Sequence, residues 1–572
     1  MTGARLAPMA RMVAQMEPAQ VVHRARLRVQ RKALHRWPNV GRRLCSGPDP
    51  AAAVGWPSDY RPIDARIPGH WPTLAVLRTR GIRLLGVSKR LGDPLDWEQA
   101  KMPLLWRLHL HYWDWAWGLT ADTDRADARA IFAGLWRSWT TASSFGRGDA
   151  WLPYPVALRA WSWCGLYHDL VAGSDLEHSY IRELSVHTGF LRRHLETDVG
   201  GNHLIKNLKA LAGLAVFFAD DRLLRFALRQ LVRQLPEQVL SDGGHYERSP
   251  AYHCQVLADL IDVDALIRAA GHAAVPDLTT AIAQMRRWLG CVLGPDAKLP
   301  MLNDGYPVAD GLLDALRPGP PPDSPLLRMS ATGLVRANVG AWYLLADAGA
   351  PCPDGLTGHA HADTLGCLVY AFGAPLLVDT GTSTYEPGAV RDYERSTAAH
   401  NTVEVDGADS TEVWGAFRAG RRARVHRLVT QHEADGVSIE AEHDGFRALS
   451  GRPCHRRRWQ LTKAGLRVDD LVIGRGDHSV AVHWHLAPGA AVRLEAGEAV
   501  ATTARGAFHI RITASCPVQL TVGTGQLAVG YQRTTGAPVL TCRMDAALPV
   551  RITTSWRHAH CFSGAAKTEG VM

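Results

Sequence analysis

The sequence predicts a multidomain α+β protein, in which a large helical domain is followed by an antiparallel β-sandwich. Three observations indicate this architecture. The chain has 572 residues, which is too long for one ordinary hydrophobic core. Its first half repeats apolar residues at helical spacing, and its second half is a series of short apolar runs separated by turns.

Residues 1–48 form the first predicted segment. Apolar and basic residues alternate there, as in VVHRARLRVQRKALHRW, which is typical of a basic amphipathic helix whose charged face is either solvated or docked on an acidic surface. Arg5 and Arg11 interrupt the apolar residues expected of an export signal, and no run of about 18 apolar residues occurs in the chain. The sequence therefore predicts a cytoplasmic location and no transmembrane segment.

Residues 49–325 form the predicted helical domain. Aromatic and leucine residues recur there at spacings of three and four, as in LLWRLHLHYWDWAW, without intervening strands, so we expect a bundle, toroid or solenoid. Its tryptophans either form the core or line a sugar-binding cleft, where aromatic rings supply flat apolar area. This set comprises Trp113, Trp115, Trp117, Trp136, Trp139, Trp151, Trp161 and Trp163.

The Pro-rich stretch RPGPPPDSP, from Arg317 to Pro325, predicts the domain boundary. Residues 326–572 then contain short β-type runs at regular spacing, such as AWYLLADAG, GCLVYAFGAPLLVD and SVAVHWHLAPG, which favour a β-sandwich.

Composition narrows the class of protein. Hydrophobic residues make up 46% and charged residues 21%, as in globular proteins. The net charge of +9 is compatible with an acidic ligand but does not single out nucleic acid, and we expect no nucleic-acid partner. The 10 cysteines form no CxxC pair, so we expect them to be reduced.

Two patches in the helical domain carry candidate functional residues. Asn202 and His203 follow two glycines where a helix begins, so Asn202 is either a helix cap or part of an anion site. The stretch SDGGHYERSPAYH, residues 241–253, groups tyrosines and histidines beyond what turn formation requires. A phenol in it would need a nearby cation or metal to act as a base.

Two further patches lie in the β region. His361, Asp379 and His400 offer the N, O and N donors that Zn²⁺ prefers, although a simple hairpin would place Asp379 opposite Leu368. A metal site and a hydrogen-bonded polar loop both remain open from spacing alone. HRRRW, residues 455–459, and HWH, residues 483–485, form either a basic face for an acidic glycan or a solvated face of the sandwich.

Taken together, GNHLIKN, DGGHYERSPAYH, GHAHADTL…LLVDTGTSTYEPG and RSTAAHNTVEVDG…EVWGAF resemble the heparinase II/III family of polysaccharide lyases. The resemblance implies an N-terminal incomplete (α/α) toroid, a C-terminal antiparallel β-sandwich and a cleft between them. It also implies β-elimination on an acidic, uronate-containing polysaccharide or oligosaccharide, with no organic cofactor and a periplasmic or extracellular place of action.

Residue by residue, the resemblance implies that Asn202, with His203 beside it, neutralises the substrate carboxylate. Tyr252 is then the catalytic tyrosine, as the acid alone or as both acid and base, and His359 is the catalytic histidine. A structural or electrostatic Zn²⁺ is implied at His361, Asp379 and His400. The remaining residues of the motifs are assigned to substrate binding: Tyr246, Glu247, Arg248, His253, Tyr385 and Tyr393.

The chain departs from the family pattern after Asp379. Thr380 replaces a proline and Ser383 stands where many relatives carry a tyrosine, for which Tyr385 or Tyr393 would compensate. This departure keeps a second hypothesis open, namely a non-catalytic protein that binds acidic glycans or assists polysaccharide assembly. A metal-dependent hydrolase is disfavoured because the chain shows no βα alternation.

Overall fold

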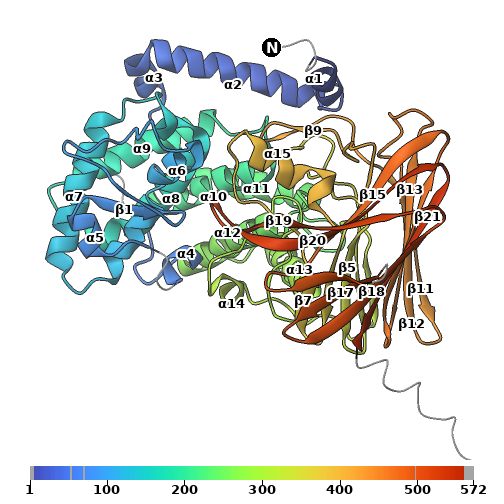
Figure 1. The fold of residues 1–572 in the computed structure, drawn as a ribbon. Helices are drawn as coiled ribbons and strands as arrows, with labels where there is room; N and C mark the ends of the chain where they lie inside the picture. The colour runs from blue at the N-terminus through green and yellow to red at the C-terminus, as the bar shows by residue number, and fades with distance from the viewer. Residues whose placement is uncertain (1–5, 52–54, 68–70, 496–497, 560–572) are drawn as a thin grey trace, which may run out of the picture.

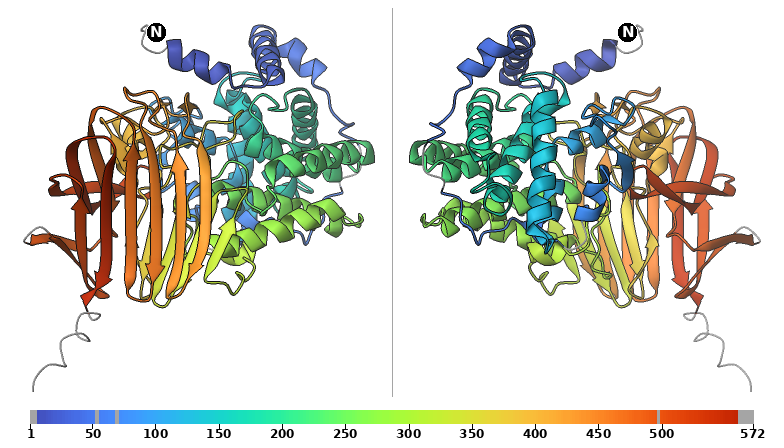
Figure 2. Two further views of the ribbon diagram at one scale, coloured as in Figure 1. Left: turned by 90° about the vertical axis from the view of Figure 1, so that its right-hand side faces the viewer. Right: turned by 90° about the vertical axis from the view of Figure 1, so that its left-hand side faces the viewer.

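The computed structural model describes residues 6–51, 55–67, 71–495 and 498–559 of the chain (Figure 1). A mainly helical part runs to Leu316, and the antiparallel strands of the β part begin at Leu326. The two parts pack side by side, as the turned views in Figure 2 show. The predicted fold class, helices followed by an antiparallel β-domain, is therefore confirmed.

The α-helices are α1 (Leu6–Val13), α2 (Pro18–Arg36), α3 (Pro38–Leu44), α4 (Ile63–Arg66), α5 (Leu74–Arg78), α6 (Leu104–Leu110), α7 (Arg125–Ala142), α8 (Pro153–Leu170), α9 (Glu177–Arg193), α10 (Gly201–Phe217), α11 (Asp221–Gln238), α12 (Pro250–Ala269), α13 (Pro276–Val292), α14 (Leu312–Leu316) and α15 (Ala389–Arg395). Short 3₁₀ helices are η2 (Asp114–Ala121), η3 (Asp149–Trp151) and η4 (Thr397–Ala399).

The strands are β1 (Gly81–Leu84), β2 (Val87–Arg90), β3 (Leu326–Met329), β4 (Leu334–Val339), β5 (Trp342–Asp347), β6 (Cys367–Ala371), β7 (Ala374–Leu377), β8 (Val403–Val405), β9 (Val413–Trp414), β10 (Arg418–Ala419), β11 (Val425–Glu433), β12 (Gly436–His443), β13 (Cys454–Thr462), β14 (Gly465–Ile473), β15 (Asp477–His485), β16 (Ala491–Glu495), β17 (Glu498–Thr503), β18 (Gly506–Ala514), β19 (Gln519–Gly530), β20 (Arg533–Ala547) and β21 (Val550–His558).

The expectation of a helical region without strands was wrong at one point. β1 and β2 pair as an antiparallel hairpin, with Leu84 opposite Val87. The turn residues Leu85 and Gly86 have φ angles of 53° and 80°. Positive φ at both central residues matches the twist of a two-residue hairpin, which a search for helical spacing does not detect.

The tryptophans form the core of the helical part, and Trp151 in addition lines a pocket at its edge. All eight that the sequence singles out are at most 5% exposed. Arg159 lies among them, with its guanidinium carbon 4.4 Å from the ring centre of Trp139. It donates to His187 Nε2 at 3.0 Å and to the carbonyl oxygens of His111 and Ala150. Burial lowers the pKa of Arg159 to about 9.

The β part is a sandwich with one apolar core. One sheet has the strand order β11-β12-β13-β14-β21-β18-β17-β16, a second β3-β4-β5-β6-β7, and a third β19-β20-β15-β8. Alternate residues of β13 point into the core, so His455, Arg457 and Trp459 are fully buried.

This inward orientation shows how the basic residues at 455–459 are used. Arg457 Nε lies 2.6 Å from Asp470 Oδ1, and the outward Arg456 and Arg458 pair with Glu442 and Glu433. The histidines at 483 and 485 are also buried. Both interpretations, a glycan-binding face and a solvated face, are therefore wrong for the buried side chains.

Helices α1 to α3, residues 6–44, form a strap that crosses both parts of the molecule (Figure 1). At one end Arg11 Nε donates to Glu412 Oε2 at 3.0 Å, and Gln20 Nε2 donates to the carbonyl oxygen of Gly355 at 3.2 Å. At the other end Arg147 donates to the carbonyl oxygen of His35 at 3.1 Å. Among the described residues, no helix combines the length and apolar character needed to cross a membrane.

Candidate active site

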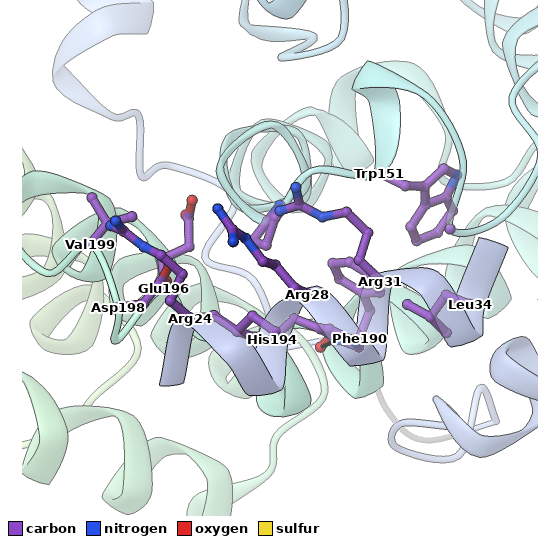
Figure 3. A pocket seen from close by; sticks show the side chains of 13 residues that line it. Arg24, Arg28, Arg31, Leu34, Trp151, Phe190, His194, Glu196, Asp198 and Val199 are labelled. Carbon is purple, nitrogen blue, oxygen red and sulfur yellow. Dashed lines mark hydrogen bonds and ion pairs between the residues drawn. The ribbon is translucent and has the colours of Figure 1, made fainter. Parts of the chain in front are cut away.

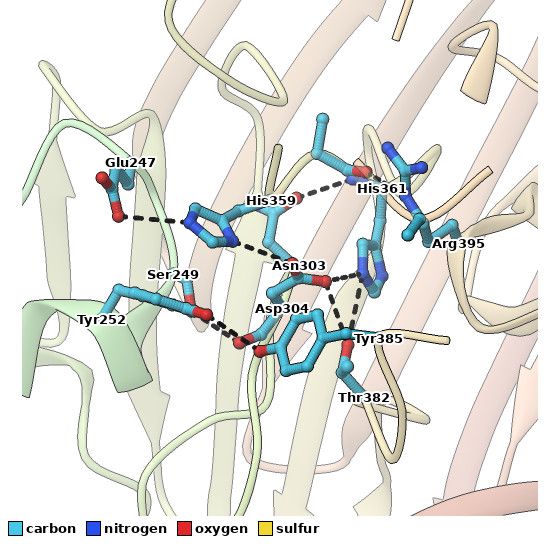
Figure 4. Close-up of polar contacts among 12 residues, drawn as sticks. Glu247, Ser249, Tyr252, Asn303, Asp304, His359, His361, Thr382, Tyr385 and Arg395 are labelled. Carbon is cyan, nitrogen blue, oxygen red and sulfur yellow. Dashed lines mark hydrogen bonds and ion pairs between the residues drawn. The ribbon is translucent and has the colours of Figure 1, made fainter. Parts of the chain in front are cut away.

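The candidate active site lies where the helical part meets the β part (Figure 4). Asn202 is in the first turn of α10 and Tyr252 in the first turn of α12. His359 comes from the loop between β5 and β6, and Tyr385 from the loop between β7 and α15. Residues separated by up to 183 positions therefore meet at one place, as the predicted roles require.

Asn202 is held by the carboxylate of Glu247. Its backbone N–H donates to Glu247 Oε1 at 2.9 Å, and its Nδ2 lies 3.2 and 3.1 Å from the two carboxylate oxygens. Gly201, next to it, has φ +53°, and a Cβ atom there would lie 1.9 Å from Glu247 Oε1. Only glycine combines this backbone conformation with this approach, so the glycine at 201 sets the geometry of the amide.

Tyr252 and His359 are in ring contact. Their ring centres are 3.9 Å apart, and the Tyr252 hydroxyl donates to the Tyr385 hydroxyl at 3.1 Å. Burial raises the pKa of Tyr252 well above its ordinary value, and the nearby Tyr385 raises it further. The neutral phenol is thereby favoured, which suits a proton donor.

Asp304 is the centre of the hydrogen-bond network. Its Oδ2 lies 2.8 Å from His359 Nδ1, and its Oδ1 lies 2.9 Å from His361 Nε2 and 2.6 Å from Arg391 Nη1. Burial alone would raise the pKa of this carboxyl, but Arg391 and the two histidines hold it well below the ordinary value. Asp304 is thus a buried carboxylate that fixes the His359 ring.

The two histidines of the His-x-His pair differ in exposure. The His359 side chain is 12% exposed, whereas His361 is fully buried. The backbone of residues 358–363 lies outside the strands, so these side chains are not confined to one face. They instead approach Asp304 from different sides, as Figure 4 shows.

Tyr385, not Tyr393, reaches the site. Arg391 is fully buried and its guanidinium carbon lies 5.1 Å from the ring centre of Tyr385, which holds that ring beside Tyr252. Tyr393 lies next to Gly525 instead. Ser383, where many relatives carry a tyrosine, is buried and bonds Glu394 through both its backbone N–H and its hydroxyl.

The remaining predicted substrate contacts support the site rather than face it. His253 is fully buried and accepts the backbone N–H of His245 on Nδ1. Arg248 donates to the carbonyl oxygen of Thr332 in the β part. Glu247 is 1% exposed with its oxygens bonded by Asn202, so we assign it to positioning. The ring of Tyr246 is 9% exposed.

His203 remains accessible beside Asn202. Its side chain is 37% exposed and its Nδ1 lies 3.0 Å from Glu196 Oε1. Burial opposes the charged ring, but Glu196 outweighs it and raises the pKa of His203 above its ordinary value. His203 can therefore present positive charge to an anionic ligand.

The predicted zinc ligands do not form a ligand set in this arrangement. Asp379 Oδ2 bonds His400 Nδ1 at 2.9 Å, while His361 Nε2 is engaged by Asp304. His361 Nδ1 and His400 Nε2 are buried and have no hydrogen-bond partner among the described residues, so two nitrogen donors are available. Within the described ranges, however, no group of three His, Cys, Asp or Glu side chains is arranged to hold a metal ion.

Zinc at these residues stays a prediction, and no catalytic step below depends on it. We expect elemental analysis of the purified protein to give about one equivalent of zinc, and an Asp379→Ala variant to give much less. Less than about half an equivalent in the wild-type protein would contradict the site.

Sequence patterns did not point to Asp304, Arg391 or Asn303. Asn303 accepts the His361 N–H on Oδ1 and donates to the Arg248 carbonyl from Nδ2. The one local indication is the stretch Leu302-Asn303-Asp304-Gly305, a polar turn between predicted elements, which by itself is ordinary loop chemistry.

By fold, the helical part followed by the antiparallel β-sandwich resembles solved structures of heparinase III. A crystal structure of heparinase III superimposes with a TM-score of 0.71 at 17% identity, covering 81% of this chain and 79% of that chain. Heparan sulfate lyase HepC from Pedobacter heparinus gives 0.60 at 15% identity, covering 89% and 86%. Likeness at such low identity concerns the fold alone.

The chain belongs to the heparinase II/III family. Residues 88–317 match the family model described as heparinase II/III N-terminus, and residues 321–559 match the model described as heparinase II/III-like, C-terminal. A further relative is FtsZ-localized protein C of Caulobacter vibrioides, which is 26% identical over 442 residues, 74% of this chain and 74% of that protein.

Proposed function

We propose that the protein is a polysaccharide lyase that cleaves a uronic-acid-containing polysaccharide by β-elimination. The observation that carries the proposal is the meeting of Tyr252 and His359, with the His359 ring fixed by Asp304 and with Glu247 between His359 and Asn202. A carboxylate-binding amide, a proton acceptor and a proton donor are the groups that this reaction requires.

The substrate carboxylate binds at Asn202 and His203. One N–H of the Asn202 amide is directed at Glu247, and an amide nitrogen has a second N–H to offer to a ligand. His203, the next residue of α10, adds positive charge when its ring is protonated. Neutralising the carboxylate at C6 makes the proton on C5 more acidic.

His359 accepts that proton. Because Nδ1 is directed at Asp304, Nε2 is the nitrogen that takes the proton, and Glu247 Oε2, 3.5 Å from Nε2, stabilises the imidazolium that results. The electron pair of the broken C5–H bond forms the C4–C5 double bond as the C4–O4 bond breaks. Tyr252 gives its hydroxyl proton to the departing O4.

A panel of acidic polymers tests the proposal. We expect the purified protein to raise the ultraviolet absorbance of at least one of heparan sulfate, hyaluronan, chondroitin sulfate, alginate or a polyglucuronate, because each cleavage leaves an unsaturated uronate. Products should carry this chromophore at their non-reducing ends by mass spectrometry. No absorbance change with any of the polymers would contradict the lyase proposal.

A second candidate is a non-catalytic protein that binds acidic glycans or takes part in polysaccharide assembly. One observation favours it, namely similarity to a protein named for its localization with FtsZ. The family resemblance, which implies a tyrosine where this chain has Ser383, agrees with it. This candidate predicts glycan binding without turnover and unchanged by Tyr252→Phe. Turnover of any panel polymer would rule it out as the main function.

A further inference from the structure

A pocket of about 250 Å³ lies between the strap and the helical part (Figure 3). Helix α2 supplies one wall, with Leu27, Arg28 and Arg31 among its lining residues. The opposite wall comes from the start of α8, the end of α9 and the loop at 194–199 that leads into α10. This volume is below the roughly 300–1,000 Å³ of drug-sized pockets, and suits a small group such as one sugar ring.

The pocket has an excess of positive charge. Arg24, Arg28 and Arg31 follow the i, i+4, i+7 spacing of one helix face, and Figure 3 shows all three directed into the pocket. Arg24 pairs with Asp198 at 3.4 Å. In the part of the chain that the structure describes, neither Arg28 nor Arg31 has an ion-pair partner.

The acidic residue that could compensate this charge is already engaged. Glu196 lines the pocket, but its Oε1 bonds His203 and its Oε2 accepts from Asn207 Nδ2 at 3.0 Å. The Arg28 and Arg31 guanidiniums are therefore left to a ligand, and guanidinium matches the planar geometry of carboxylate and sulfate.

The other lining residues suit a sugar ring. Leu34, Trp151 and Phe190 supply apolar and aromatic surface to the same pocket. Sugars present apolar C–H faces together with polar edges, so aromatic surface beside guanidinium groups fits an acidic sugar better than a bare inorganic anion.

The pocket adjoins the candidate active site through two contacts. Glu196 connects it to His203, which follows Asn202 directly. Pro153 lines the pocket, and the next residue, Tyr154, has its ring centre 4.4 Å from that of His203. His203 therefore contacts both Glu196 of the pocket wall and Tyr154 beside Pro153, and it is the residue next to Asn202.

We propose that the pocket is a second acidic-sugar subsite, in which Arg28 and Arg31 hold the carboxylate or sulfate of a residue next to the one bound at Asn202. The proposal rests on the proposed function, because it assumes that the glycan is bound at Asn202. It also assigns the strap to substrate binding. It also defines the substrate class, since the polymer must carry anionic groups on neighbouring residues.

Binding of size-defined hexasaccharides of heparan sulfate and of alginate, measured by calorimetry at low salt, tests the subsite. We expect Arg28→Gln/Arg31→Gln to weaken binding about tenfold to a hundredfold, because two charge-assisted contacts are lost. The matched control is Arg26→Gln/Arg36→Gln, which removes two exposed arginines of the same helix that do not line the pocket. The control should change the Kd by no more than about twofold.

If both double variants weaken binding equally, the effect comes from the overall positive charge of the helix, and the subsite is overturned. Unchanged binding by Arg28→Gln/Arg31→Gln would overturn it too. Sulfate ion bound as tightly as the hexasaccharides would also overturn it in favour of a small-anion site. If the wild-type protein binds neither hexasaccharide, the subsite is overturned as well.

Absorbance assays on the same samples separate this proposal from the lyase function. Arg28- and Arg31-dependent binding without turnover would support the subsite and contradict the lyase proposal. Turnover by Arg28→Gln/Arg31→Gln with the same KM as the wild-type protein would support the lyase function and contradict the subsite.

Discussion

Tyr252→Phe is expected to lower kcat on a cleaved polymer about a thousandfold. The change removes the hydroxyl that protonates O4 but keeps the ring that packs against His359 at 3.9 Å. General acid catalysis contributes roughly 10²- to 10⁴-fold, and the C4–O4 bond breaks poorly when the oxygen leaves without a proton. The value of kcat is measured from the initial rate of ultraviolet absorbance change at saturating polymer.

Tyr343→Phe provides the matched control for the loss of a buried phenol. The Tyr343 hydroxyl donates to the backbone carbonyls of Val292 and Leu293, which are not residues of the candidate site. This variant should lose about 1 kcal/mol of stability and keep its kcat. A Tyr252→Phe variant within tenfold of wild-type kcat would remove Tyr252 from the mechanism.

Oligosaccharide affinity of Tyr252→Phe distinguishes a chemical role from a binding role. Because the hydroxyl acts on the departing oxygen in the transition state, the Kd for an acidic hexasaccharide should stay within about threefold. A large loss of affinity with little loss of kcat would instead favour the glycan-binding candidate.

The architecture was predictable because its determinants are local. Leucine and aromatic spacing in segments such as LLWRLHLHYWDWAW reports the period of a helix, and alternation in SVAVHWHLAPG reports that of a strand. The same local view failed at 455–459, where His455 and Arg457 of β13 face the core and both pair with the buried Asp470. Charge in a short run does not reveal which side of a strand is buried.

The centre of the site was not predictable because its partners are distant in sequence. Asp304 is 55 residues from His359 and 87 from Arg391, and no periodicity links these positions. The motif resemblance indicated His359 and Tyr252 but gave no reason to choose between Tyr385 and Tyr393. Packing of Arg391 against the Tyr385 ring decides that choice.

Asp304→Asn is expected to damage both stability and catalysis. Asparagine keeps the shape but removes the charge that compensates Arg391, which is fully buried. Breaking a buried pair on one side costs about 3–5 kcal/mol. With the orientation of His359 also lost, kcat should fall at least about a hundredfold, equivalent to roughly 3 kcal/mol. Urea denaturation measures the loss of stability. Initial rates, divided by the concentration of folded protein, measure the loss of kcat.

Asp470→Asn is the control that separates the two effects of Asp304→Asn. Asp470 is also fully buried between an arginine and a histidine, with Arg457 Nε at 2.6 Å and His455 Nε2 at 2.7 Å, but in the sandwich core. Its loss should destabilise the protein by a similar 3–5 kcal/mol or so while kcat per folded molecule stays near wild type. If both variants lower kcat equally, Asp304 acts only through stability; if Asp304→Asn alone does, it positions the catalytic histidine.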